Sequence, residues 1–151
     1  MDEELSDWHQ VVNTDLTGVV NMTYTVGTRM RDSGNGGNII NITSNAGFTV
    51  NRNISLSSYN TAKAAANHFT RSMAIELGSY NIRVNAIAPG YINDGFSKGI
   101  PPEREKAIIN GQGVDRLGTV MEIGAMAVFL ASPASGFTTG AIMVVDGGYS
   151  L

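Results

Sequence analysis

The feature that most constrains the fold is a strand, a helix and a second strand that follow one another in the middle of the chain. The run NIINIT (38–43) is rich in β-branched residues and has the length of a buried strand. Apolar residues recur at helical spacing from Tyr59 to Gly78, and NIRVNAIAPG (81–90) then predicts another strand, closed by its proline and glycine. This order produces a right-handed crossover with parallel strands, so we expect an α/β fold.

Segments on both sides of this unit add helices and at least one strand. Apolar side chains at helical spacing predict one long helix from about Ser6 to Met30. The stretch RDSGNGGN comes next, and we interpret it as a plain turn, because a phosphate loop follows a strand and opens a helix. A helix at 121–131 and a strand at 140–146 complete a sheet of at least three parallel strands with flanking helices.

Composition limits the class of protein. The chain has 151 residues, 42% of them hydrophobic, which suits one domain with a buried core. Its net charge of −3 and lack of a basic run argue against nucleic acid or a membrane as partner. There is no cysteine, no apolar run of bilayer length and no metal-ligand spacing around His9 or His68. We therefore expect a soluble, cytoplasmic protein without a metal site.

Candidate site residues gather at one edge of the predicted sheet. In an open parallel sheet, ligands bind beyond the carboxyl ends of the strands. Ser44 directly follows the first strand, and Pro89 with Gly90 closes the second. Tyr59 and Lys63 are four residues apart, hence on one face of a helix that starts where the first loop ends. We expect all five residues to meet at this edge and to form the active site.

Several stretches carry a resemblance to a known family. NIINITSNAG, YNTAKAA, RSMAIEL, NIRVNAIAPGYI and TTGAIMVVDGG resemble the second half of the classical short-chain dehydrogenase/reductase family, nearly end to end. The resemblance implies a partial Rossmann-type parallel sheet without the first βαβ units of the doubly wound fold. Residues 1–151 are then the C-terminal portion of a single dinucleotide-binding and catalytic domain. YNTAKAA, PGYI and FTTG are similar to the fungal NADP-dependent mannitol dehydrogenases and sorbose reductases.

This resemblance implies an oxidoreductase that transfers hydride between a nicotinamide cofactor and a carbonyl or alcohol substrate, such as a ketose or polyol. Tyr59 is then the general acid in carbonyl reduction and the base in alcohol oxidation. Lys63 supplies a positive charge that favours the phenolate and also binds the nicotinamide ribose. Ser44 holds the substrate oxygen, where negative charge develops.

The resemblance also implies the cofactor contacts. The backbone of Pro89, Gly90 and Ile92 matches the loop that runs along the nicotinamide in the family. The cofactor is NADP or NAD, with NADP favoured by the fungal likeness. Asp94 stands where many members place a threonine against the nicotinamide amide, and an ionised aspartate cannot donate that hydrogen bond.

Asp15, in TDLTG, is a departure at the fourth catalytic position, where the family usually has an asparagine. A carboxylate there accepts hydrogen bonds in a proton relay to Lys63 and stabilises the lysine cation. We interpret the site as altered rather than inactive.

A larger departure is that the family's glycine-rich fingerprint and its NAD-or-NADP selecting residue do not occur in this sequence. We therefore expect the chain alone to bind dinucleotide weakly or not at all, and strand 38–43 to be an unpaired edge.

An alternative function is a catalytically inactive relative that acts through its helical dimer interface with a full-length partner. For the chain in general we expect a homo-oligomer or a hetero-oligomer with a full-length relative. Residues 96–118 match the family's substrate lid, with a solvated surface helix as the equal alternative. Asp146 and Gly147 match a segment near the family's subunit interface, or equally a strand that runs into a turn.

Overall fold

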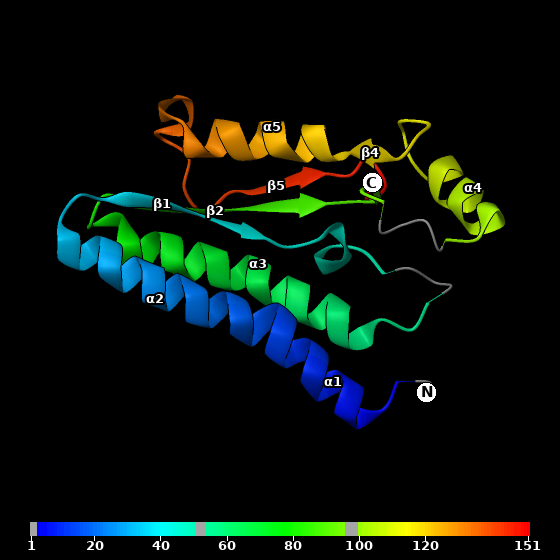
Figure 1. The fold of residues 1–151 in the computed structure, drawn as a ribbon, viewed down its shortest axis with the longest axis horizontal. Coiled ribbons are helices and arrows are strands. Elements are labelled where there is room, and N and C mark those ends of the chain that lie inside the picture. The colour runs from blue at the N-terminus through cyan, green and yellow to red at the C-terminus, as the bar shows by residue number, and fades with distance from the viewer. Residues whose placement is uncertain (1–2, 51–53, 96–99) are drawn as a thin grey trace.

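The computed structural model describes residues 3–50, 54–95 and 100–151, and the elements follow one another along the chain as Figure 1 shows. In order they are α1 (Leu5–Val12), a π-helical segment (Asn13–Thr17), α2 (Gly18–Ser33), β1 (Gly37–Ile42), a 3₁₀ turn (Asn45–Gly47), α3 (Ser57–Gly78), β2 (Ile82–Pro89), β3 (Ile92–Asn93), α4 (Pro102–Asn110), β4 (Gly118–Thr119), α5 (Val120–Ala131), a second 3₁₀ turn (Pro133–Ser135) and β5 (Ile142–Val145).

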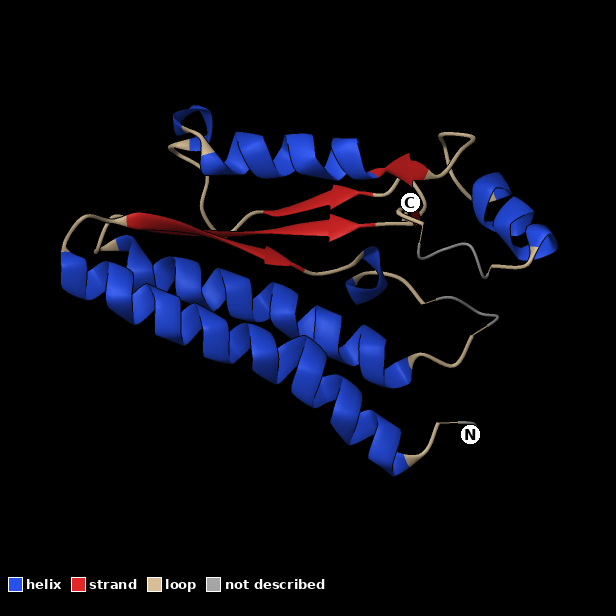
Figure 2. Ribbon diagram, in the orientation of Figure 1, coloured by secondary structure: helices blue, strands red, loops and turns tan. Residues whose placement is uncertain are grey.

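The main sheet has the strand order β1-β2-β5, with all strands parallel. Ile39 lies opposite Val84 in the first pair, and Ala86 lies opposite Ile142 in the second. Helices α2 and α3 cover one face of the sheet and α5 covers the other (Figure 2). The predicted α/β class with three parallel strands is therefore confirmed. Within the described residues β1 pairs only with β2, so it is the edge strand that the sequence predicted.

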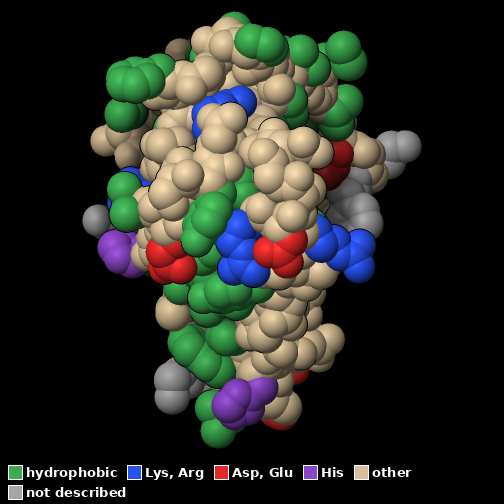
Figure 3. All heavy atoms as spheres, turned by 90° about the vertical axis from the view of Figure 1, so that its left-hand side faces the viewer, with side chains coloured by type: hydrophobic (Ala, Val, Ile, Leu, Met, Phe, Trp, Pro, Cys, Tyr) green, Lys and Arg blue, Asp and Glu red, His purple; other side chains and the backbone are tan. Residues whose placement is uncertain are grey.

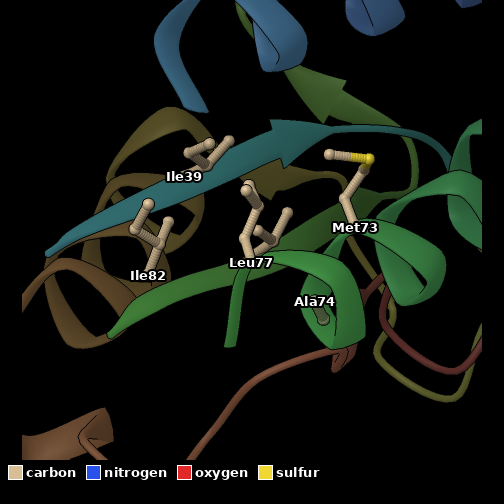
Figure 4. Packing of buried hydrophobic residues seen from close by; sticks show 6 residues of the cluster. Ile39, Met73, Ala74, Leu77 and Ile82 are labelled. Carbon is tan, nitrogen blue, oxygen red and sulfur yellow. The ribbon is translucent and has the colours of Figure 1, made fainter. Parts of the chain in front are cut away.

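The core lies between β1, β2 and α3. Ile39 from β1, Met73 and Leu77 from α3, and Ile82 from β2 point toward one another, as Figure 4 shows. Val84, the next inward residue of β2, is fully buried in the same cluster. The close approach of the strand-helix-strand unit therefore removes its β-branched and leucine side chains from water, which is the main force that holds this fold together.

The first helix is longer and less regular than its sequence predicts. Helical structure runs from Leu5 to Ser33, but Asn13–Thr17 forms a π-helical turn within it. A π-helical turn of five residues is too short to show a period of its own, so the apolar pattern of the sequence did not reveal it. After the helix, Gly34 and Gly36 take left-handed backbone angles, with φ of 69° at each. These glycines form the plain turn that was predicted before β1.

The segment between residues 91 and 118 combines a short helix with two short strands. The helix is α4, with a proline in its first turn, and β3 and β4 pair in parallel, with Ile92 opposite Gly118. Strands of two residues are too short to show any alternation, so they escape a sequence pattern. The proposed lid region begins at residues 96–99, which lie outside the described residues.

The surface mixes charged and apolar side chains. Figure 3 views the end of the molecule at the left of Figure 1 and shows acidic and basic side chains side by side there. Arg31 and Asp32 form an exposed ion pair of 2.9 Å near the end of α2. On α5, Met121 and Val128 are 77% and 70% exposed. None of the described helices combines the length and the apolar composition that a bilayer crossing requires.

Candidate active site

An open cleft of about 360 Å³ lies at the carboxyl ends of β1 and β2. Six of the residues singled out in the sequence line it, together with Thr43 and two residues from the first turn of α5. The lining residues are Thr43, Ser44, Tyr59, Pro89, Gly90, Ile92, Asp94, Val120 and Ile123. The edge of the sheet that topology favours for ligand binding is thus the edge where the cleft is found.

Tyr59 and Lys63 stand one turn apart in the first half of α3. The Lys63 ammonium nitrogen lies 5.4 Å from the centroid of the Tyr59 ring, so cation and phenol are direct neighbours. Lys63 is buried and Tyr59 is half-buried at the cleft. The helical spacing predicted this pairing, and the burial of Lys63 means that its charge acts through protein rather than through water.

Asp15 partners Lys63 from the π-helical segment. Its Oδ1 lies 2.9 Å from Lys63 Nζ, and the two side chains are 27% and 9% exposed. The π-helical segment packs against α3, which brings a residue of the first helical stretch onto the face of α3 that carries Lys63. The ion pair holds the lysine charge in one position beside the Tyr59 ring. The structure therefore places all three residues in one connected group.

Ser44 begins the loop that follows β1. The Thr43 backbone N–H donates to the Ile87 carbonyl over 2.8 Å, which ties the start of this loop to β2. Ser44 Oγ accepts a 3.1 Å hydrogen bond from the backbone N–H of Ala46. As a donor, the same Oγ lies 3.5 Å from Asn45 Oδ1. Ser44 therefore caps the 3₁₀ turn with its own side chain while its oxygen borders the cleft.

Pro89, Gly90 and Ile92 form the opposite wall. The Gly90 N–H donates to the Val145 carbonyl over 3.0 Å, which extends the pairing of β2 with β5 beyond the strands. A Cβ atom on Gly90 would lie 2.5 Å from Asp146 Cβ, so this position requires glycine. Asp94, whose N–H donates to the Ile92 carbonyl over 3.1 Å, adds an acidic side chain to the cleft.

The contribution of α5 to the cleft was not predicted from the sequence. Val120 and Ile123, in its first turn, add apolar surface to the cleft. The start of this helix has a sequence signal, because Thr119 and Glu122 have the spacing of a capping box and form one in the structure. That signal marks where the helix begins, but not which ligand-binding edge it faces.

The cleft has the size of a small-molecule pocket. Its volume falls in the range of such pockets, and Tyr59 and the Pro89–Gly90 segment line it. The glycine turn at 34–37 lies before β1, at the amino end of the strand. It is therefore at the end of the sheet away from the cleft, which lies at the carboxyl ends of the strands. It cannot serve as a pyrophosphate cradle for a ligand in this cleft.

Known dehydrogenases are similar to this chain over nearly its whole length. A family model described as enoyl-(acyl carrier protein) reductase matches residues 1–150. The 7α-hydroxysteroid dehydrogenase of Escherichia coli K12 is 38% identical over 97% of this chain and 57% of its own length. The NADP-dependent mannitol dehydrogenase of Hypocrea jecorina is 37% identical over 99% of this chain and 56% of its own. The chain therefore spans little more than half the length of these relatives.

Solved structures are similar over the same extent. A short-chain type dehydrogenase/reductase from Mycobacterium marinum superposes with a TM-score of 0.93 at 34% identity, over 98% of this chain and 58% of that one. A 7α-hydroxysteroid dehydrogenase complexed with NADH and 7-oxoglycochenodeoxycholic acid gives a TM-score of 0.90 at 38% identity, over 98% and 57% of the two chains. The arrangement of helices around the three-stranded sheet is thus shared with complete enzymes.

Proposed function

Because the chain belongs to the short-chain dehydrogenase/reductase family, we propose that residues 1–151 are the C-terminal, catalytic portion of a nicotinamide-dependent oxidoreductase domain. One observation carries this proposal. Ser44 and Tyr59 border the same cleft, and the buried Lys63 lies 5.4 Å from the Tyr59 ring while it is paired with Asp15 at 2.9 Å. A phenol beside a fixed cation, in the same open cleft as a serine hydroxyl, has the makings of an acid/base pair with an oxygen-binding group.

The proposed reaction joins a hydride and a proton to a carbonyl group. The nicotinamide, when bound, supplies the hydride to the carbonyl carbon or takes it back from the alcohol. Tyr59 gives its hydroxyl proton to the carbonyl oxygen in reduction and takes the alcohol proton in oxidation. Lys63 stabilises the phenolate that remains, and Ser44 holds the substrate oxygen during the transfer. Asp15 fixes Lys63 in position and completes the polar path from Tyr59 toward the first helix.

For the cofactor we propose NADP, with NAD as the alternative. The mannitol dehydrogenase relative is described as NADP-dependent, whereas a related solved structure is a complex with NADH. In this chain Lys63 would bind the nicotinamide ribose, and the backbone of Pro89, Gly90 and Ile92 would border the ring. Asp94 supplies only an acceptor when ionised, so the usual side-chain donor to the nicotinamide amide is replaced there.

For the substrate we propose a small polyhydroxylated carbonyl compound, a ketose or its polyol. The cleft is small, and Thr43, Ser44 and Asp94 give one part of its lining a polar character. Relatives named for mannitol, galactitol and sorbose support this class, although a hydroxysteroid dehydrogenase is equally similar in sequence.

A second candidate function is an interaction role in a homo-oligomer or with a full-length relative. It is favoured by exposed apolar side chains of α2, of the C-terminal part of α3 and of the turn that follows α3. Met22, Tyr24, Ile75 and Tyr80 are each about half exposed or more. An inactive chain that binds a longer relative would use this surface.

The decisive experiment joins this chain to the part of a longer relative that lies outside the region of similarity. The chain is fused behind the amino-terminal segment of the Hypocrea jecorina mannitol dehydrogenase, and NADPH oxidation is followed with a panel of ketoses. Tyr59→Phe is expected to reduce turnover by about 10²-fold or more and to leave NADPH binding unchanged. Tyr80→Phe, an exposed tyrosine outside the cleft, is the matched control and keeps full turnover.

Two results would decide against the enzyme. Equal turnover in the Tyr59→Phe fusion would remove Tyr59 from its role. No turnover in the unmodified fusion, combined with co-elution of the 151-residue chain with a full-length relative, would favour the interaction role instead. The unfused chain is expected to bind NADPH weakly or not at all in a fluorescence titration.

A further inference from the structure

A line of polar side chains connects the loop after β5 to the active-site serine. Asn45 Nδ2 donates to Asp146 Oδ2 over 3.3 Å, across 101 positions of sequence. Asn45 Oδ1 in turn faces the Ser44 hydroxyl at 3.5 Å. Both Asn45 and Asp146 are more than nine-tenths buried, with exposures of 6% and 8%. Burying polar side chains is costly unless they are hydrogen-bonded. A buried contact between side chains this far apart in sequence therefore indicates a role in stability or function.

Backbone hydrogen bonds and a neighbouring glycine fix the position of the Asp146 side chain. Its Oδ1 accepts from the backbone N–H of Gly148 and its Oδ2 from that of Ser150, each over 3.0 Å. The missing side chain of Gly90 leaves the space that Asp146 occupies. Burial raises the pKa of Asp146, but hydrogen bonds from Ser150, Gly148 and Asn45 outweigh it and leave the pKa below its usual value. The group is therefore a carboxylate at neutral pH.

The carboxylate fixes which way the Asn45 amide points. An ionised carboxylate accepts hydrogen bonds and cannot donate them, so Asn45 must turn its NH₂ group toward Asp146. The carbonyl oxygen of the same amide is then left facing Ser44. Ser44 Oγ already accepts from the Ala46 N–H, so the Asn45 oxygen gives the serine hydrogen a defined acceptor. Asp146, in the loop after β5, is thereby linked through Asn45 to the Ser44 hydroxyl.

We propose that Asn45 and Asp146 are positioning residues that orient the Ser44 hydroxyl for the oxidoreductase reaction, an inference that rests on the proposed function. With its hydrogen on Asn45, Ser44 presents a lone pair to the cleft and accepts a hydrogen bond from an alcohol. To bind a carbonyl oxygen, the same hydrogen turns from Asn45 into the cleft and donates. The pair gives Ser44 two defined states in place of a freely rotating hydroxyl, and neither residue touches the substrate.

The first test uses the 151-residue chain and needs no turnover. NMR follows the Ser44 Cβ signal, which reports the side-chain rotamer, and the Ala46 amide that is bonded to it. Asn45→Ala and Asp146→Asn are expected to shift both signals. Asn85→Ala is the matched control, because Asn85 is fully buried with bonds to Thr138 and Ala141 but does not line the cleft. It is expected to lower stability without moving the Ser44 signal.

The second test uses the fusion enzyme and separates turnover from binding. Asn45→Ala and Asp146→Asn are each expected to lower kcat about tenfold, as for the loss of one charge-assisted hydrogen bond, while the KM for NADPH stays within about twofold. A double variant that combines Asn45→Asp with Asp146→Asn swaps the two groups, so the site again holds one carboxylate and one amide. The carboxylate at position 45 then provides the acceptor for the Ser44 hydroxyl. This double variant is expected to recover part of the lost kcat.

The outcomes distinguish the two proposals. An unmodified fusion without turnover contradicts the proposed function, while the NMR result still decides whether the pair orients Ser44. Single variants that shift neither the Ser44 Cβ signal nor the Ala46 amide overturn the positioning role. So does a double variant that is no better than the worse single variant, or an Asn85→Ala fusion with the same loss of kcat.

Discussion

Removing the Asp15 carboxylate should destabilise the chain because it leaves Lys63 buried without its counter-charge. At 2.9 Å the gross attraction of two unit charges is about 6 kcal/mol at an effective dielectric constant of about 20, and desolvation offsets much of it. Breaking a fully buried pair costs about 3–5 kcal/mol, whereas exposed pairs contribute about 0–1 kcal/mol. With Lys63 9% and Asp15 27% exposed, we expect Asp15→Ala to cost about 2–3 kcal/mol.

Urea denaturation of the 151-residue chain measures this cost in a double-mutant cycle. Lys63→Met keeps the length of the side chain without its charge. The double variant Asp15→Ala with Lys63→Met should therefore be more stable than Asp15→Ala alone, because no charge is then left buried. Asp15→Asn should lie between the original chain and Asp15→Ala, since an amide oxygen still accepts from the ammonium.

The control is the exposed pair of Arg31 and Asp32, which has the same 2.9 Å separation. Asp32→Ala should have no measurable effect, because water screens that pair. The reasoning is refuted if Asp15→Ala is as stable as the original chain, or if the double variant is less stable than Asp15→Ala. Either result would mean that the burial of Lys63 does not depend on its carboxylate partner.

Two further predictions concern the frame of the site. Gly90→Ala places a Cβ atom 2.5 Å from Asp146 Cβ and should cost about 1–3 kcal/mol in thermal unfolding, whereas Gly124→Ala, in open space on α5, should stabilise by about 0.5–1 kcal/mol. Hydrogen bonds from Arg116 and Thr119 lower the pKa of Glu122 to about 2. Its stabilising contribution is therefore complete above the ordinary value of 4.5 and is lost as pH falls through about 2. Glu122→Gln should flatten the change of Tm with pH in that interval, with unchanged slopes counting against the capping interaction.

Sequence patterns predicted most of the fold because they reflect local periodicity. The β-branched run before Thr43 and the apolar spacing of α3 each reveal which face of an element is buried. Parallel pairing followed from the order of the elements, and the meeting of Ser44, Tyr59 and Gly90 followed from the rule that the carboxyl ends of parallel strands share one edge. The two-residue strands β3 and β4 lay below the length at which a period can be detected.

The α/β class, the edge of the sheet that holds the cleft and the spacing of Tyr59 and Lys63 can all be predicted from the sequence. The remote groups that complete the site depend on the tertiary structure. The π-helical turn presents Asp15 to Lys63, and the loop after β5 presents Asp146 to Asn45. Such contacts are invisible to local patterns because a hydrogen bond or ion pair depends on distance in space. Residues 101 positions apart reach that distance only when the sheet and its helices have packed.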